Sequence, residues 1–173
     1  MDCGLYHGET TFKFLKWCNR NYKKIIAFEP NRDSYLFCLN QTEIQNIKNF
    51  QMFNKGVWNK NETLHFKIVN GTDSFITSED GEKLIETITI DEVLAGEGAT
   101  FIKMDVEGAE LNALYGAKIT IQNYRPKLAI CIYHKPEDII TILSYLYELV
   151  PEYKFYLRHY STYSQETVLY AIP

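Results

Sequence analysis

The sequence predicts a single α/β domain, residues 1–173, with a mostly parallel sheet and an antiparallel hairpin at its C-terminal end. Short apolar runs, typical of buried strands, alternate with segments that carry apolar residues at helical spacing. Polar residues and glycines follow several of these runs, as they do at the carboxyl ends of strands in open sheets. The last two predicted strands, residues 153–160 and 166–172, are joined by a loop too short for a parallel crossover, so they pair antiparallel.

Length and composition are those of one soluble globular domain. The chain has 173 residues, of which 46% are hydrophobic and 23% are charged. A formal net charge of −4 argues against a general nucleic-acid-binding protein. No apolar run approaches the roughly 20 residues that span a bilayer, and no signal peptide opens the sequence. The four cysteines lack the spacing of a metal site or a disulfide framework, which predicts no metal, reduced thiols and a cytoplasmic location.

The first segment, residues 2–11, is typical of the turn between a buried strand and a helix. Gly4 and Gly8 permit tight backbone angles and the close approach of a ligand, and a helix expected at about residues 11–18 offers free N–H groups. Such a turn normally follows a full apolar strand, but only one residue precedes Asp2. We therefore expect an N-terminally truncated domain whose first strand is truncated or missing and whose ligand binding is poor.

A second strand, at residues 24–30, ends in an acidic residue. Glu29 follows the glycine turn by about 20 residues, the spacing at which dinucleotide-type folds place the acid that binds ribose hydroxyls. The alternative is a strand-end carboxylate in solvent. Pro30 stops the strand, and Asn31 or Asp33 is a suitable N-cap for a helix that runs to residue 39.

The middle of the chain predicts strands towards the edge of this sheet. A third strand, residues 50–58, carries Asn54 and Gly56 near its end. Two alternating segments then predict half-exposed antiparallel strands beside the main sheet. These segments are residues 63–69 and 84–90, joined by a polar loop at 70–73, and a short helical turn follows at 91–94.

Residues 101–110 are the most informative stretch. A buried strand leads into Asp105, Glu107 and a glycine, and a helix is expected from there towards residue 124. Ligands of open α/β sheets lie outside the carboxyl ends of the strands, where both acids would stand. Alternatively, Asp105 caps the helix and Glu107 lies in its first turn. A further buried strand, residues 127–133, ends at His134 and is followed by another helix.

Five segments form a recognisable set: DCGLYHGETT at 2–11, AFEPN at 27–31, NKGVW at 54–58, ITIDEV at 88–93 and FIKMDVEGAELNALYGA at 101–117. Together they resemble the FkbM family of S-adenosylmethionine-dependent methyltransferases, and the last segment is the most specific. The resemblance implies the Rossmann-like class I methyltransferase fold, with a mostly parallel sheet and a terminal antiparallel hairpin. It also implies S-adenosylmethionine as the cofactor.

The resemblance assigns cofactor-binding roles to residues at the strand ends. Asp2 would lie near the ammonium group of the cofactor, and Glu29 would accept hydrogen bonds from both ribose hydroxyls. Asn54 and Gly56 would lie near the adenine or ribose. The full set implied for cofactor binding is Asp2, Gly4, Tyr6, Gly8, Thr10, Glu29, Pro30, Asn54, Gly56 and Asp105.

The resemblance further implies O-methylation of a small molecule, with a sugar hydroxyl of a glycan or glycolipid precursor as acceptor. Asp105 would face the methyl donor, and Asp105 and His134 are the candidate bases. The imidazole is better matched because its ordinary pKa is near 6.5. A histidine that satisfies a loop carbonyl is the alternative for His134. Glu107 would fix the loop or bind an acceptor hydroxyl. Positioning of the two reactants supplies roughly 7–11 kcal/mol in favourable cases, so geometry is expected to matter more than the base.

Two other functions fit parts of the sequence. The short first strand favours a binding or assembly domain that keeps the fold without catalysis. The glycine turn and Glu29 partly match a nicotinamide-dependent oxidoreductase, but the spacing is G-x-x-x-G and a G-x-G-x-x-G run is absent. Expected partners are a small-molecule or glycan acceptor, with no nucleic acid and no membrane span. The tyrosine-rich C-terminal region offers a surface for a sugar or for a second copy in a homodimer.

Overall fold

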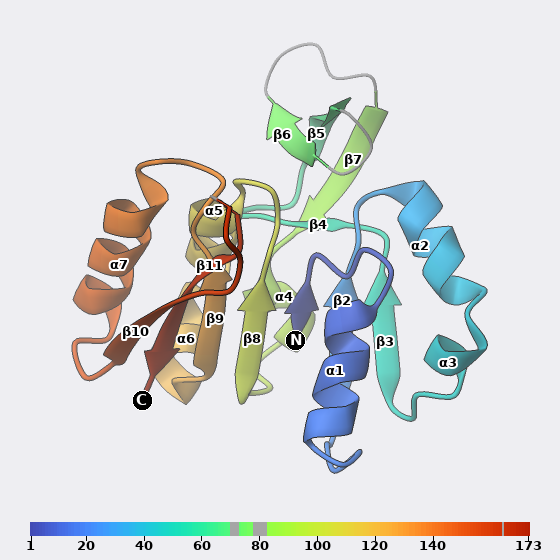
Figure 1. Cartoon of the computed structure of the whole chain (residues 1–173), viewed down its shortest axis with the longest axis horizontal. Helices are drawn as coiled ribbons and strands as arrows, with labels where there is room; N and C mark the ends of the chain where they lie inside the picture. The colour runs from blue at the N-terminus through green and yellow to red at the C-terminus, as the bar shows by residue number, and fades with distance from the viewer. Residues whose placement is uncertain (70–72, 78–82, 164) are drawn as a thin grey trace.

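The computed structural model describes residues 1–69, 73–77, 83–163 and 165–173, which a large and a small sheet organise (Figure 1). The strands of the large sheet are β1 (Asp2–Cys3), β2 (Ile25–Phe28), β3 (Phe50–Phe53), β8 (Phe101–Met104), β9 (Lys127–Cys131), β10 (Lys154–His159) and β11 (Thr167–Ile172). Their order is β10-β11-β9-β8-β1-β2-β3. Neighbours from β9 to β3 run parallel, and β11 pairs antiparallel with both β9 and β10. The predicted α/β fold with a C-terminal hairpin is confirmed.

Helices cover both faces of the large sheet, because strand residues on both faces are apolar. The helices are α1 (Glu9–Trp17), α2 (Arg32–Leu39), α3 (Thr42–Gln45), α4 (Ile90–Leu94), α5 (Glu110–Tyr115), α6 (Lys118–Tyr124) and α7 (Asp138–Leu149). In β2, Ile25 and Ala27 belong to one buried core with α1 to α3, whereas Ile26 and Phe28 belong to a second core with α4 to α7. Figure 1 shows α1 in front of the sheet and α4 and α6 behind it. Asn31 caps α2 as predicted, because its side chain accepts hydrogen bonds from the backbone N–H groups of Asp33 and Ser34.

The first strand is reduced to two residues but keeps its central place in the sheet. Asp2 pairs in register with Ala27 of β2 and with Lys103 of β8. Backbone bonds extend this pairing, since the N–H of Asp105 donates to the carbonyl of Cys3 over 3.0 Å. A truncated strand was one of the two outcomes expected from the sequence. Two more backbone bonds continue the pairing beyond the strand, since the N–H of Gly4 donates to the carbonyl of Phe28 over 3.1 Å and that of Lys103 donates to the carbonyl of Met1 over 3.0 Å.

The small sheet lies beyond the carboxyl ends of the main strands (Figure 1). Its strands are β4 (Gly56–Val57), β5 (Thr63–Val69), β6 (Asp73–Thr77) and β7 (Lys83–Ile88), in the order β4-β7-β5-β6. The sequence predicted one strand over residues 50–58, but this segment divides into β3 and β4. It did not predict β6, because a polar loop was expected at residues 70–73. Residues 70–72 of that loop lie outside the described residues.

The helix expected to run towards residue 124 divides at Gly116 into α5 and α6. A Cβ atom at Gly116 would lie 1.9 Å from the carbonyl oxygen of Trp58, so only glycine allows this close approach. The sequence pattern continues across the break because both helices bury the same face, with Ala113 and Ile121 in the larger core. Among the described residues, no helix is long and apolar enough to cross a membrane.

Substitution of Gly4 by alanine tests how closely the turn after β1 packs against the end of β8. The φ angle of Gly4 is +83°, and an added Cβ would lie 1.8 Å from the backbone oxygen of Asp105. Gly96 has a φ angle of +89° but would meet nothing within 4 Å, so it is the matched control. We expect Gly96→Ala to cost about 1–2 kcal/mol for the left-handed backbone alone. Gly4→Ala should cost roughly 1–3 kcal/mol more because of the overlap with Asp105. Equal losses in urea unfolding would contradict the close contact.

Candidate active site

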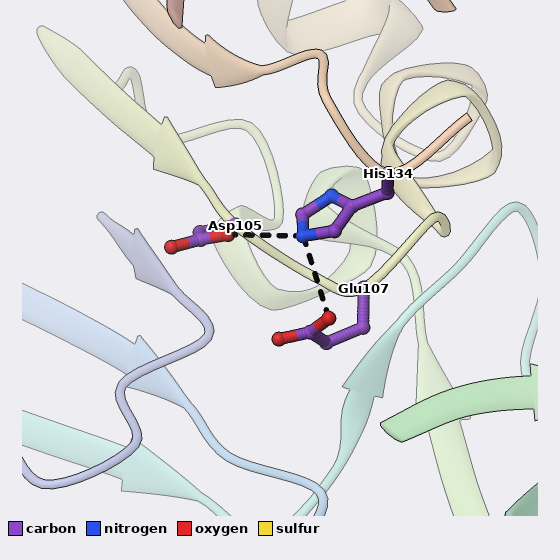
Figure 2. Close-up of side chains that lie close together, drawn as sticks. All are labelled: Asp105, Glu107 and His134. Atoms are coloured by element: carbon purple, nitrogen blue, oxygen red, sulfur yellow. Dashed lines mark ion pairs between the residues drawn. The ribbon is translucent and has the colours of Figure 1, made fainter. Parts of the chain in front are cut away.

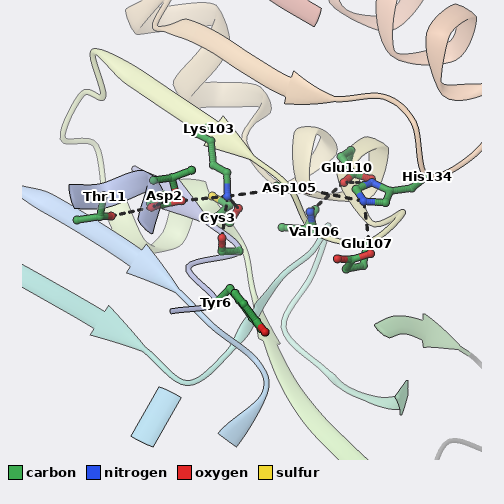
Figure 3. A network of polar contacts seen from close by, with 12 residues as sticks. Asp2, Cys3, Tyr6, Thr11, Lys103, Asp105, Val106, Glu107, Glu110 and His134 are labelled. Atoms are coloured by element: carbon green, nitrogen blue, oxygen red, sulfur yellow. Dashed lines mark hydrogen bonds and ion pairs between the residues drawn. The ribbon is translucent and has the colours of Figure 1, made fainter. Parts of the chain in front are cut away.

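The carboxyl ends of β1, β2, β8 and β9 gather most of the residues singled out in the sequence. Figure 3 shows this region as a connected network of polar contacts. The network has two parts. One surrounds the glycine turn after β1, and the other surrounds His134 after β9.

Glu29 holds the glycine turn against the end of β2. Its side chain is buried, with 6% of the residue exposed. One carboxylate oxygen accepts a 2.7 Å hydrogen bond from the N–H of Tyr6, and the other accepts a 2.9 Å bond from the N–H of Asn31. Burial raises the pKa of the Glu29 carboxyl, although these two donors oppose the rise. The alternative of a strand-end carboxylate in solvent is therefore wrong.

The glycine turn is built from left-handed residues. Gly4, Tyr6 and Gly8 all have positive φ angles, of 83°, 50° and 87°. Gly8 is also the N-cap residue of α1, so the free N–H groups of this helix begin at the turn, as predicted. The ring of Tyr6 stacks on that of His7 with centroids 3.8 Å apart, and His7 contacts Phe37 at 4.3 Å. A tyrosine with a left-handed backbone costs conformational free energy, so contacts around the turn must hold Tyr6 in this conformation.

Asp2 lies beneath this turn and binds residues of α1 and β8. Its Oδ2 atom accepts hydrogen bonds from the hydroxyls of Thr11 at 2.6 Å and Thr10 at 3.0 Å. Its Oδ1 atom lies 3.2 Å from the Nζ atom of Lys103. In the structure Asp2 therefore joins three elements, and the predicted role of Asp2 and Thr10 towards the cofactor stays a prediction.

Lys103 is a buried cation that the sequence analysis missed. Its ammonium group donates to the carbonyl of Gly4 over 2.7 Å and lies 3.9 Å from Oδ2 of Asp105. Burial lowers the pKa of Lys103, but the carboxylates of Asp2 and Asp105 outweigh that effect and raise it. The available signal was a lysine inside a strand whose neighbours Ile102 and Met104 are apolar. The side chain of Lys103 is only 15% exposed, so its charge has little access to solvent and requires a counter-charge.

Two further predicted cofactor residues, Asn54 and Gly56, follow β3 in the chain, and Asn54 contacts the end of β2. The side-chain N–H₂ of Asn54 donates to the carbonyls of Glu29 at 2.8 Å and of Pro30 at 3.1 Å. Gly56 lies farther along, in β4 of the small sheet, where it pairs with Thr87. Asn54 and Pro30 thus shape the end of β2 beside Glu29.

Asp105 stands at the end of β8 and is the link between the two parts of the network. Its Oδ1 atom accepts a 3.1 Å hydrogen bond from the hydroxyl of Tyr133. Burial raises the pKa of Tyr133, and the negative charge of Asp105 raises it further. The phenol therefore stays protonated and can donate this hydrogen bond. The suggestion that Asp105 caps the following helix is wrong, because the N-cap residue of α5 is Ala109.

His134 is fixed by an acid that the sequence analysis did not assign to the site. Glu110 is fully buried, and its Oε1 atom lies 2.9 Å from Nδ1 of His134 and accepts a 2.9 Å bond from the N–H of Val106. Burial lowers the pKa of His134, but the contact with Glu110 and the charges of Glu110, Glu107 and Asp105 outweigh it and raise the pKa. The alternative for His134 was a hydrogen bond to a loop carbonyl, but the ring nitrogen Nδ1 faces the side-chain carboxylate of Glu110.

Glu107 completes a cluster with Asp105 and His134 (Figure 2). The Nε2 atom of His134 lies 3.5 Å from Oδ1 of Asp105 and 3.4 Å from Oε2 of Glu107. Glu107 has a φ angle of 55°, so it does not lie in the first helical turn as the alternative reading suggested. Its left-handed backbone precedes Gly108, at φ 84°, and turns the chain so that the carboxylate points towards His134. All three predicted catalytic residues therefore meet at one corner.

This geometry agrees with the family to which the sequence points. The FkbM methyltransferase domain model matches residues 2–158. The chain belongs to the FkbM methyltransferase domain family. The family and fold predicted from the sequence are thereby confirmed, and the glycine turn, Glu29 and Asp105 all lie within the matched range.

Solved structures support the same fold. An FkbM methyltransferase from Methylobacillus flagellatus superposes with a TM-score of 0.81 and 28% identity, covering 98% of this chain and 42% of its own. An rRNA methylase from Streptococcus thermophilus matches with a TM-score of 0.60 and 15% identity, covering 98% of this chain and 82% of its own. A Streptococcus mutans protein crystallised with SAH (S-adenosylhomocysteine) gives 0.54 and 14%, covering 98% and 85%. No curated protein gave a significant match.

Lys103→Met tests the buried charge network. The substitution keeps the length of the side chain but leaves the buried carboxylate of Asp2 without its cation. We expect a loss of about 3–5 kcal/mol in the free energy of unfolding, the usual cost of breaking a buried ion pair. Lys24→Met is the control, because Lys24 pairs with Glu97 at 4.0 Å on the surface and should cost at most about 1 kcal/mol.

Adding Asp2→Asn separates charge from packing. The double variant with Lys103→Met should lose less stability than the sum of the two single variants, because the uncompensated charge is removed. Additive losses in chemical denaturation would show that Lys103 acts through packing alone.

Proposed function

We propose that this chain is the catalytic part of a methyltransferase that transfers the methyl group of S-adenosylmethionine to a hydroxyl oxygen. The observation that carries the proposal is the buried carboxylate of Glu29 at the end of β2. It faces the glycine turn and already accepts one backbone N–H on each oxygen. Each oxygen retains acceptor capacity, so the pair suits two vicinal ribose hydroxyls.

Binding of the cofactor along the strand ends would bring its methyl group towards Asp105. The cofactor-binding set remains as predicted: Asp2, Gly4, Tyr6, Gly8, Thr10, Glu29, Pro30, Asn54, Gly56 and Asp105. The positive sulfonium would lie near the carboxylates of Asp105 and Glu107. Lys103 offsets the charge of Asp105 only in part, because its ammonium lies closer to Asp2 than to Asp105. Asp105 would therefore stabilise the charged donor.

The reaction requires an acceptor oxygen in line with the S–CH₃ bond. The O–CH₃ bond forms as the S–CH₃ bond breaks, the bonding electrons stay on sulfur, and S-adenosylhomocysteine is released. The hydroxyl proton must leave, and the corner formed by Asp105, Glu107 and His134 supplies hydrogen-bond acceptors for it. Alignment of the two reactants is the larger contribution, at roughly 7–11 kcal/mol in favourable cases.

The acceptor class rests on family membership and on the chemistry of this corner. A sugar hydroxyl of a glycan or glycolipid precursor is the proposed acceptor, because carboxylates and an imidazole bind hydroxyl groups well. We place the reaction in the cytoplasm, where the four thiols stay reduced. Cys3, Cys38 and Cys131 are buried and form no disulfide among the described residues.

Glu29→Gln is the variant that tests the cofactor site. Although the sequence alone led us to expect poor binding, β1 keeps its place between β2 and β8, so calorimetric titration with S-adenosylmethionine should show binding to the original chain. Binding to the variant should be at least about tenfold weaker. One lost hydrogen bond to a charged group costs about 1.5–3 kcal/mol, and 1.4 kcal/mol is a factor of ten. Glu43→Gln, which removes an exposed charge from α3, is the matched control and should bind normally.

A pH series supplies a second readout for the same residue. Only the ionised carboxylate accepts both hydroxyls, and burial raises the pKa of Glu29. Affinity should therefore be constant at high pH and decrease as the pH falls through that raised pKa, whereas Glu29→Gln should lack this step. Binding of NAD with similar affinity would favour the oxidoreductase, and absence of binding by either ligand would favour a non-catalytic domain.

A further inference from the structure

The corner formed by Asp105, Glu107 and His134 has the arrangement of a cation site. One ligand atom from each residue, two carboxylate oxygens and one imidazole nitrogen, lies within 4.8 Å of the others. The two separations from Nε2 of His134 are 3.5 and 3.4 Å. Neighbouring ligands held at roughly 2.0–2.2 Å from one ion have separations of this size. Figure 2 shows both carboxylates directed at the same edge of the imidazole.

The imidazole is oriented as metal-binding histidines usually are. Its side chain is only 10% exposed, and Nδ1 faces the buried carboxylate of Glu110 at 2.9 Å. Both ring nitrogens are buried, and neither makes a hydrogen bond of standard geometry with a described residue. With Nδ1 against Glu110, Nε2 points into the space between Asp105 and Glu107. A carboxylate behind a ligating histidine fixes the ring and strengthens it as a ligand.

The charges of the corner also favour an added cation. Three carboxylates, those of Asp105, Glu107 and Glu110, surround one imidazole. Lys103 compensates them only in part, because its ammonium is 3.2 Å from Asp2 and 3.9 Å from Asp105. A single proton on His134 leaves this group of side chains negative. Closely spaced acids of this kind are stabilised when a cation binds between them.

From these contacts we infer that Asp105, Glu107 and Nε2 of His134 bind a divalent transition-metal ion, for which Mn²⁺ is the probe, with Glu110 as the residue that positions the imidazole. The mixed set of two oxygens and one nitrogen differs from the all-oxygen cages of Ca²⁺ and Mg²⁺. The role of the ion rests on the proposed function, since the ion would hold the acceptor hydroxyl beside the methyl donor. The inference also departs from the sequence prediction, which expected no metal.

A bound ion changes what His134 does in the transfer. Its Nε2 atom becomes a ligand and no longer accepts a proton. With an ion bound, its charge would make the acceptor hydroxyl more acidic, and the proton would pass to water instead of to the side chains of this corner. The alkoxide would then take the methyl group, so charge and atoms balance.

Electron paramagnetic resonance of Mn²⁺ tests the site without cofactor or acceptor. Titration of the chain with MnCl₂ should remove one equivalent of the free-ion signal. Glu107→Gln should weaken this binding by at least about tenfold, because one charged ligand is replaced by a neutral one. Glu137→Gln is the matched control: it removes an exposed acid three residues after His134 that is outside the cluster, and it should bind like the original chain.

Proton NMR of the unaltered chain gives a readout that needs no variant. Substoichiometric Mn²⁺ should broaden the imidazole signals of His134 before those of His7 and His159. Absence of a bound equivalent at millimolar Mn²⁺, equal binding by Glu107→Gln, or earlier broadening of His7 or His159 would each overturn the inference. Metal is titrated here without S-adenosylmethionine, and the cofactor is titrated above without metal. Failure of one result therefore leaves the other intact.

Discussion

The ion pair between Asp2 and Lys103 is the interaction on which the rest of the site depends. It lies where a two-residue strand must hold its place between β2 and β8. The threonine hydroxyls of α1 complete the shell of Asp2, so one carboxylate fixes a strand, a neighbouring strand and a helix together. Removing one partner of such a buried pair would leave an uncompensated charge between β1, β8 and α1, which is strongly destabilising.

From that anchor, close packing carries the geometry to the strand ends. Gly4 brings the first turn against the backbone of Asp105, and Glu29 receives the turn from the other side through Tyr6. At the far side, Glu110 and His134 form a buried pair that faces Asp105 and Glu107. The left-handed backbones of Tyr6 and Glu107 lie at the two ends of this arrangement. Strain of this kind persists only where the surroundings fix it, and it is common at functional sites.

Local patterns predicted the strands of the large sheet, the C-terminal hairpin and the place of Glu29 at the end of β2, because alternation of apolar runs with turn residues is visible within short windows. Lys103 and Glu110 were missed, since their roles arise from contacts with Asp2 and His134 that are distant in sequence. The same holds for the break at Gly116, where the carbonyl of Trp58 occupies the space of a side chain. The one local signal was a charged residue between the apolar residues Ile102 and Met104, because a poorly solvated charge requires a counter-charge, here Asp2.

An NMR titration of the amide signals with S-adenosylhomocysteine tests whether the cofactor binds at the end of β2. The N–H groups of Tyr6 and Asn31 both donate to the carboxylate of Glu29, so they report on whatever that carboxylate binds. If Glu29 accepts the ribose hydroxyls, both signals shift together in a saturable way with one dissociation constant. Saturable shifts confined to other regions, with Tyr6 and Asn31 unchanged, would contradict the placement of the cofactor at the end of β2.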